Sequence, residues 1–187
     1  MKTANKMLAL VAIICSTFSA GSAFAQKEHT VMVGGAPMYP SKNIVQNAVN
    51  SKDHTTLVAA VKAAGLVETL SGPGPFTVFA PTNEAFNKLP KGTVETLVKP
   101  ENKGKLTTIL TYHVVAGNMD AKSLMAKIKE GKGKATLTTV QGGALTLMQK
   151  GNELWVMDAK GNKAKVTIKD VHQSNGVIHV IDTVLMP

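Results

Sequence analysis

The chain has 187 residues and a formal net charge of +9, and 44% of its residues are hydrophobic, a composition typical of a globular protein and unlike that of a disordered tail. All 21 basic residues are lysine, so no guanidinium is present to read phosphate or guanine in a bidentate manner, which argues against a sequence-specific nucleic-acid binder. The single cysteine, Cys15, excludes an intramolecular disulfide framework and supplies too few thiolates for a structural zinc site.

The first 25 residues have the pattern of a secretory signal peptide. Lys2 and Lys6 supply a positive start, an apolar run covers residues 7–18, and Ala23-Phe24-Ala25 forms the small-x-small pattern at which such signals are cleaved. The apolar run is too short to span a bilayer comfortably. We therefore expect cleavage after Ala25, which leaves a secreted or periplasmic protein with no transmembrane segment; a lipid anchor on Cys15 is the weaker alternative.

Residues 26–42 are expected to form an extended N-terminal arm, because two glycines and two prolines disfavour a regular element there. His29, Met32 and Met38 in this arm could offer soft ligands to copper, so an exported copper-handling protein is an alternative function. Methionine is more often packing material than a ligand. We therefore expect no metal site and a single domain over residues 43–187.

Helical periodicity dominates the first half of this domain. A short helix is predicted after Ser41, and a second is predicted to be capped by Asp53 or Thr55 and to end at Gly65. A third is expected to begin near Pro100. The apolar positions that support the second and third helices are Leu57, Val61 and Ala64, and then Leu106, Ile109 and Leu110 together with His113.

The β-strand signals lie mostly in the second half. Residues 76–80 form an early apolar run ended by Pro81, after which Thr82 is placed to cap a short helix. From Ala135 onward apolar and polar residues alternate, and glycine-containing pairs separate the runs at hairpin distances. The sequence thus predicts an α+β fold in which an antiparallel meander is joined by the one early strand.

Three segments, residues 76–86, 112–117 and 175–182, together resemble the fasciclin (FAS1) domain, and they occur in the family's order. The resemblance covers about residues 43–186 and implies a FAS1-like wedge of mainly antiparallel β-strands flanked by several short α-helices. The first and last segments contain the structural motif residues Phe79, Pro81, Thr82, Asn83 and Phe86, and Asn175, Gly176 and His179.

The chain looks most like the single-domain secreted bacterial members, and the resemblance implies adhesion or another extracellular interaction. We expect an extracellular or envelope protein or an anionic polysaccharide as partner, no specific nucleic acid and no cofactor. Some animal members engage integrins through an Asp-Ile pair before the last motif, and Asp170-Val171 occupies that place here. Tyr112-His113 matches a second element discussed as an interaction site. These four residues are the candidate partner-binding residues.

Each candidate also has a structural interpretation. Asp170 is expected to be a solvated turn residue that ends a strand over residues 163–169. His113 is expected to be a packed histidine that holds a helix-to-strand junction by a hydrogen bond, and His179, in the apolar final run, has the same interpretation. Thr82 and Asn83 are better explained as a cap at a strand-to-helix corner than as a binding pair.

A cationic strand face is the rival binding surface. Lys163, Lys165 and Lys169 alternate with apolar residues, and the lysines at 127, 129, 132 and 134 are expected to extend the same face. Such a face can dock to anionic polysaccharide or lipid headgroups, or it can serve only to keep a sheet edge from pairing with other chains.

No motif in the sequence points to catalysis. The five histidines form no His-Glu-x-x-His pattern and no Gly-x-Ser-x-Gly turn is present. Gly133-Lys134 resembles the end of a phosphate-binding loop, but Ala135 replaces the required hydroxyl residue. We therefore expect that the protein is not an enzyme, although distant residues can assemble a site that no motif reveals.

Overall fold

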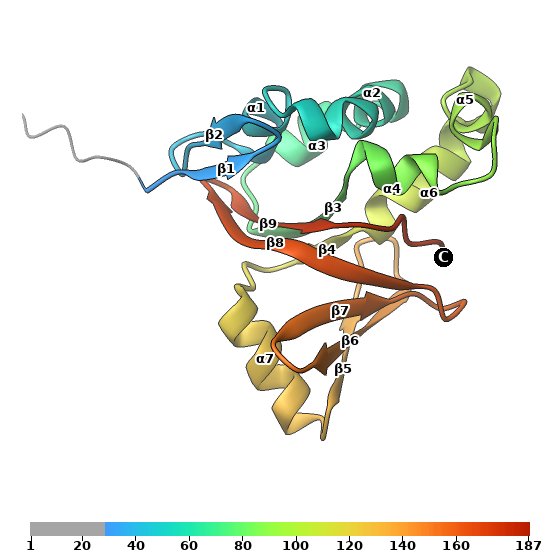
Figure 1. Cartoon of the computed structure of the whole chain (residues 1–187). Helices are drawn as coiled ribbons and strands as arrows, with labels where there is room; N and C mark the ends of the chain where they lie inside the picture. The colour runs from blue at the N-terminus through green and yellow to red at the C-terminus, as the bar shows by residue number, and fades with distance from the viewer. Residues whose placement is uncertain (1–28) are drawn as a thin grey trace, which may run out of the picture.

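A seven-stranded sheet in the order β4-β3-β9-β8-β7-β6-β5 runs through the middle of the molecule (Figure 1). The structure is a computed structural model and describes residues 29–187. The predicted signal peptide and Cys15 lie outside the described residues. The strands of the sheet are β3 (Phe76–Pro81), β4 (Val114–Ala116), β5 (Lys134–Thr138), β6 (Ala144–Lys150), β7 (Glu153–Met157), β8 (Lys163–Gln173) and β9 (Gly176–Ile181).

The pairing of these strands confirms the predicted topology. Strands β5 to β9 pair antiparallel with their neighbours in sequence, as a meander does. The early strand β3 pairs in parallel with β9 and antiparallel with β4, so it lies inside the sheet and not at its edge. The α+β class with a mainly antiparallel sheet and short flanking helices is therefore confirmed.

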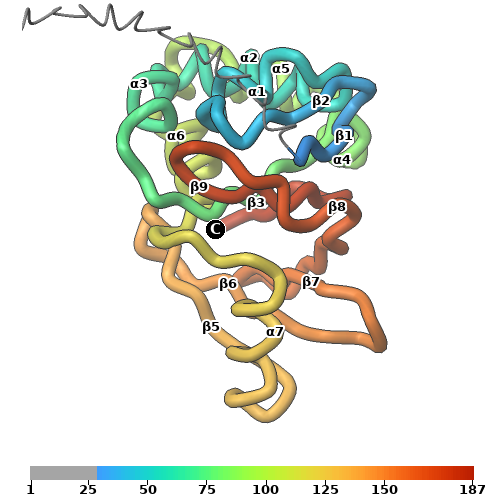
Figure 2. Tube along the Cα trace, turned by 90° about the vertical axis from the view of Figure 1, so that its left-hand side faces the viewer, coloured from blue at the N-terminus to red at the C-terminus, as the bar shows by residue number. Residues whose placement is uncertain are grey.

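The helices form two groups around the sheet (Figures 1 and 2). Helices α1 to α6 gather above β3 and β9, whereas α7 lies below, beside β5 and β6. Within residues 29–187 no helix has the length and apolar character needed to cross a membrane. The helices are α1 (Ile44–Ala48), α2 (Thr55–Ala64), α3 (Val67–Ser71), α4 (Asn83–Asn87), α5 (Thr93–Leu97), α6 (Lys103–Tyr112) and α7 (Ala121–Glu130), with 3-10 turns η1 (Lys52–His54) and η2 (Pro100–Asn102).

The long helices α2 and α6 occur where the periodicity predicted them. Gly65 ends α2 in the left-handed conformation at φ 72°, which glycine adopts without steric cost. The predicted caps are wrong in two places: Asn43 instead of Ser41 caps α1, and neither Asp53 nor Thr55 caps α2. Helix α7 was not predicted, and Asp120 caps it by accepting from the backbone N–H of Ser123 at 2.8 Å.

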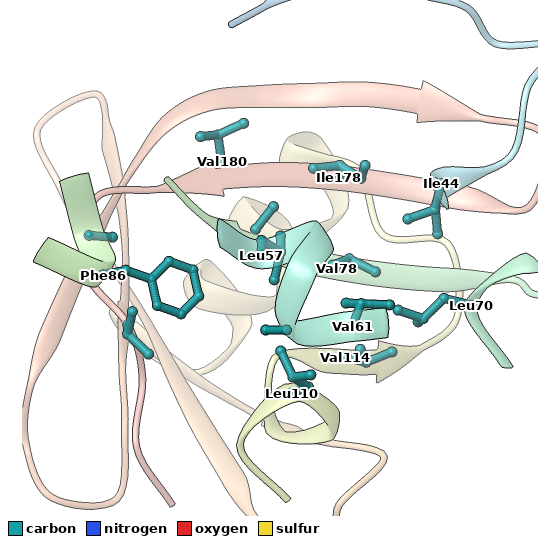
Figure 3. Packing of buried hydrophobic residues seen from close by; sticks show 14 of the residues in the cluster. Ile44, Leu57, Val61, Leu70, Val78, Phe86, Leu110, Val114, Ile178 and Val180 are labelled. Atoms are coloured by element: carbon teal, nitrogen blue, oxygen red, sulfur yellow. The ribbon is translucent and has the colours of Figure 1, made fainter. Parts of the chain in front are cut away.

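Two hydrophobic cores occupy the two faces of the sheet. Along β3, Val78 and Ala80 point into an upper core beneath α1 to α6, while Phe79 points into a lower core. Figure 3 shows side chains of the upper core converging between α2, α6 and strands β3 and β9. The lower core is closed by α7, whose Leu124 and Ile128 are at most 1% exposed. The chain thus needs both helix groups to cover its sheet.

The expected extended arm is wrong, because residues 31–38 form a hairpin of β1 (Val31–Val33) and β2 (Ala36–Met38). Its buried side chains, Val33 and Met38, join the upper core at 4% and 3% exposure. Met32 is 57% exposed and, by the strand register, lies on the opposite face from Met38. The two methionines suggested as copper ligands are therefore held apart, and packing explains Met38.

Candidate functional site

Tyr112 ends α6 and is fully buried. Its hydroxyl donates to the carbonyl of Ala144 at 2.7 Å and accepts from the backbone N–H of Ala159 at 3.0 Å. These bonds tie α6 to β6 and to the turn between β7 and β8. Both hydrogen-bonding functions of the hydroxyl are thus used inside the protein, so no part of this side chain is presented to a partner.

His113 links α6 to β4 and is 3% exposed. Its Nδ1 lies 2.8 Å from the carbonyl oxygen of Ile109, and its Nε2 accepts from the backbone N–H of Leu185 at 3.0 Å. This pattern fixes the neutral tautomer with the proton on Nδ1. Burial lowers the pKa of His113 to about 4. The side chain holds the junction between helix and strand, as the structural interpretation predicted.

Asp170 does not end a strand, because β8 continues through it to Gln173. It lies in an irregular part of β8 at φ 60°, and it is half-buried. Its Oδ1 accepts from the backbone N–H of Ala121, the first residue of α7, at 2.6 Å. A carboxylate is favoured there because the first N–H groups of a helix have no partner within the helix. Asp170 therefore anchors α7 to the sheet.

Val171 is 1% exposed and belongs to the upper core, so its expected role as a partner-binding residue is wrong. The irregular pairing of β8 explains this outcome. Two shifts in register between β8 and β9, on either side of Ile168, change which side chains face the helices. Alternation along a regular strand could not reveal these shifts.

His179 connects Asp170 to the segment before α7. Its Nδ1 accepts from the backbone N–H of Asp170 at 3.3 Å, which leaves Nε2 to donate to the carbonyl of Met119 at 2.9 Å. The ring stacks on Phe79 with centroids 5.7 Å apart. Burial lowers the pKa of His179, which favours the neutral ring. The histidine is therefore a packed connector, like His113.

The remaining residues of the first motif also connect elements. Thr82 caps α4 by accepting from the backbone N–H of Ala85 at 3.2 Å, as predicted. Asn83 is instead a bridge to η1 and α2, since it accepts from Thr56 N–H at 3.0 Å and donates to the Lys52 carbonyl at 2.8 Å. The motif's larger side chains, Phe79 and Phe86, are buried, and Pro81 is the last residue of β3.

The last motif closes the turn between β8 and β9. Asn175 donates to the carbonyls of Leu70 and Gly72 at 2.8 and 2.9 Å and accepts from Ile44 N–H at 3.0 Å. At Gly176 a Cβ would lie 2.1 Å from the carbonyl oxygen of Phe76, a distance that no real Cβ contact shows. Only glycine therefore lets β9 come this close to β3.

The three lysines of β8 do not form one face. Lys163 and Lys165 alternate with Ala164 and Val166, which point into the lower core, so these lysines point the other way. Beyond the first register shift Ile168 packs against the upper core, so its neighbour Lys169 lies on the lower-core side. The expectation of a single face over Lys163, Lys165 and Lys169 is therefore wrong.

Trp155 and Glu153, which lie beside Lys165, are not among the residues that the sequence motifs indicated. Trp155 is opposite Lys165 in the register of β7 and β8, and its indole N–H donates to Glu153 at 3.2 Å. The ammonium of Lys165 pairs with the same carboxylate at 2.5 Å. The alternation of Leu154 and Val156 with Trp155 was a usable signal, since it separates buried from outward positions.

Neither motif histidine belongs to an arrangement typical of a catalytic site, and the buried Ser–His contact among the described residues joins Ser51 Oγ to His54 Nδ1 at 2.9 Å. The described part of the chain contains no group of three or more histidine, cysteine, aspartate or glutamate side chains able to hold a metal ion. His113 and His179 use both ring nitrogens in hydrogen bonds to the backbone, so neither is placed to activate a nucleophile.

Proteins of Synechocystis and Mycobacterium bovis are among those with sequences similar to this chain. The family model for the fasciclin domain matches residues 52–187. Protein sll1483 of Synechocystis is 47% identical over 100% of this chain and 99% of its own length. Immunogenic protein MPB70 of Mycobacterium bovis is 41% identical over 75% of this chain and 66% of its own. Cell surface glycolipoprotein MPB83 of the same species is 39% identical over 75% of this chain and 58% of its own length.

A solved structure shares the fold. A FAS1 domain pair from the insect cell adhesion molecule fasciclin I matches with a TM-score of 0.68 at 17% sequence identity. The match covers 86% of this chain and 59% of the insect chain.

Proposed function

The chain belongs to the fasciclin domain family, and we propose that it works outside the cell as an adhesion-type module that binds an envelope protein or a polysaccharide. The observation that supports this proposal is that the motif side chains form hydrogen bonds within the protein. Tyr112, His113, Asp170 and His179 all bond to the protein's own backbone, so their chemistry is used to hold the fold. In the proposed role, a partner therefore binds to the surface of the fold and not to these side chains.

The location proposed for the protein is the periplasm or the exterior, after cleavage near Ala25. The support is the signal-like pattern at residues 1–25 and the printed name of one relative, a cell surface glycolipoprotein. An extracellular setting also suits a domain that, on the proposed cleavage, contains no cysteine to be oxidised.

A non-enzymatic role agrees with the comparisons, because they indicate no enzymatic family. In the proposed role no cofactor is required, and copper handling has no support beyond the residue types in the hairpin. Binding needs only a surface of suitable shape and charge.

The proposal is tested by recovering partners from the native envelope and medium with the immobilised mature protein. Asp170→Ala is the informative variant, because the Asp170 carboxylate accepts a hydrogen bond from the first backbone N–H of α7 and is not merely solvated. We expect any loss of binding in this variant to accompany a loss of stability. Loss of binding at unchanged stability would instead make Asp170 a direct contact, and failure to recover any partner reproducibly would contradict the proposed function.

A further inference from the structure

One face of the sheet over β5 to β8 faces away from α7 and carries a row of side chains in register across four strands. The row is Lys134, Met148, Trp155 and Lys165, each directly opposite the next. Trp155, Met148 and Lys165 are half-buried, and Lys134 is exposed. In the described part of the chain α7 is the helix that packs on β5 and β6, and it does so from the opposite, lower-core face. We call this outward surface the Trp155 face.

The neighbouring row extends the Trp155 face along the strands. It contains Thr146, Met157 and Lys163, again in register. The four strands span about 14 Å from the first lysine of the Trp155 row to the last, at the usual spacing of sheet strands. The face therefore has an aromatic ring and two thioethers at its centre and ammonium groups at its margins.

Positive charge exceeds negative charge on this face. The lysines at 134, 150, 163 and 165 surround one carboxylate, Glu153, which is bonded to both Lys165 and the indole N–H of Trp155. That pairing holds the pKa of Glu153 below its usual range, so the carboxylate stays ionised. Asp182, which accepts from the backbone N–H of Lys165 at 2.9 Å, is paired with Lys88 at 3.6 Å. The bonds through Glu153 also restrain the indole over the sheet.

We propose that the Trp155 face docks an acidic polysaccharide, a conclusion that rests on the proposed function as an extracellular binding module. The apolar C–H side of a sugar ring packs on an indole, and the carboxylates of uronic acids meet the flanking lysines. The hydroxyl of Thr146 can exchange hydrogen bonds with sugar hydroxyls. A half-buried tryptophan in the middle of a sheet face fits a polysaccharide chain lying across the strands better than insertion into a lipid surface, for which the aromatic side chain would need to protrude.

The first test uses fluorescence, because Trp155 is the only tryptophan in the chain. Titration of the mature protein with sodium alginate is expected to change the Trp155 emission saturably, and the apparent affinity is expected to fall as salt rises. Neutral dextran is expected to leave the emission unchanged. Alginate binding, measured independently on an alginate-coated sensor, with no change in emission would overturn the assignment of the site.

The second test uses a matched pair of charge variants. Lys134→Gln with Lys163→Gln removes two positive charges from the Trp155 face, and Lys127→Gln with Lys129→Gln removes two from α7 on the other side of the sheet. We expect the first variant to lose about tenfold in alginate affinity, a change of about 1.4 kcal/mol, and the second to change less than about twofold. Equal losses in the two variants would mean that net charge alone drives binding and would overturn the proposal.

Trp155→Ala completes the series. It is expected to weaken alginate binding while retaining the unfolding midpoint, because the side chain it truncates lies outside both cores. If truncation lowers the midpoint, Trp155→Phe keeps the ring and is expected to restore stability and most of the affinity.

Other anionic ligands provide the remaining outcomes. Two other anionic probes are vesicles of equal parts phosphatidylglycerol and phosphatidylcholine, and single-stranded DNA. Tighter binding of either probe than of alginate, with dependence on the same residues, would overturn the polysaccharide assignment. Absence of alginate binding together with recovery of a protein partner from the envelope would reject this inference and leave the proposed function standing. Absence of both would count against the function itself.

Discussion

Replacement of His113 by glutamine should remove much of the acid sensitivity of the fold. The ring is 3% exposed and neutral, with one nitrogen beside the Ile109 carbonyl and the other accepting from Leu185 N–H. Glutamine cannot make both bonds from this position. At neutral pH we expect His113→Gln to lower the free energy of unfolding by about 1–3 kcal/mol, the usual cost of an unsatisfied buried group.

The pH dependence follows from the pKa of His113, which burial lowers from 6.5 to about 4. The unfolded chain therefore binds a proton more readily than the folded one, so protonation favours unfolding. This contribution to stability is fully present above about pH 6.5 and is lost as the pH falls toward about 4. A difference of about 2.5 pKa units corresponds to about 3 kcal/mol.

Urea unfolding at a series of pH values between about 7 and about 4 measures this effect. The wild-type free energy of unfolding should fall by about 3 kcal/mol more than that of His113→Gln over this range. Burial also lowers the pKa of His54 and His179, so both proteins retain a smaller acid sensitivity in the same direction. His172→Gln, at an exposed position on β8, is the control. Identical pH dependence in the wild type and His113→Gln would refute the assignment of the neutral buried histidine.

Two further predictions follow from single contacts, and a third follows from the sequence pattern at the N-terminus. Asp170→Ala leaves the first N–H of α7 without its partner and should lower the free energy of unfolding in urea by about 1–3 kcal/mol. Asp170→Asn keeps an acceptor oxygen and should lower it less. Equal losses in the two variants would contradict the anchoring role. Gly176→Ala forces a Cβ against the Phe76 carbonyl and should prevent the close pairing of β3 and β9. We expect it to lower the midpoint of thermal unfolding by more than a surface substitution does. A midpoint equal to that of the wild type would show that the contact relaxes easily. Intact-mass analysis of the exported protein should give an N-terminus at Gln26, and a retained Cys15 would contradict cleavage after Ala25.

Local patterns in the sequence were enough to predict much of the fold. Alternating residues after Ala135 and their glycine-containing turns gave the meander, and the i, i+4 spacing of Leu57 and Val61 gave α2. These patterns succeed because residues at i and i+2 in a strand, or at i, i+3 and i+4 in a helix, share a face, so the spacing of apolar residues indicates which side chains are buried. They missed the hairpin of β1 and β2 because its strands are three residues each, too short to show alternation.

The candidate site depended on pairing between strands that are distant in sequence. The register shifts of β8 bury Val171, separate Lys169 from Lys163, and turn the Asp170 carboxylate toward α7. The sequence by itself determined which residues alternate. It could therefore predict that the lysines point outward and that the two motif histidines are buried. Only the tertiary structure decided which of them share a face, because a bulge inserts one residue and reverses every side chain beyond it.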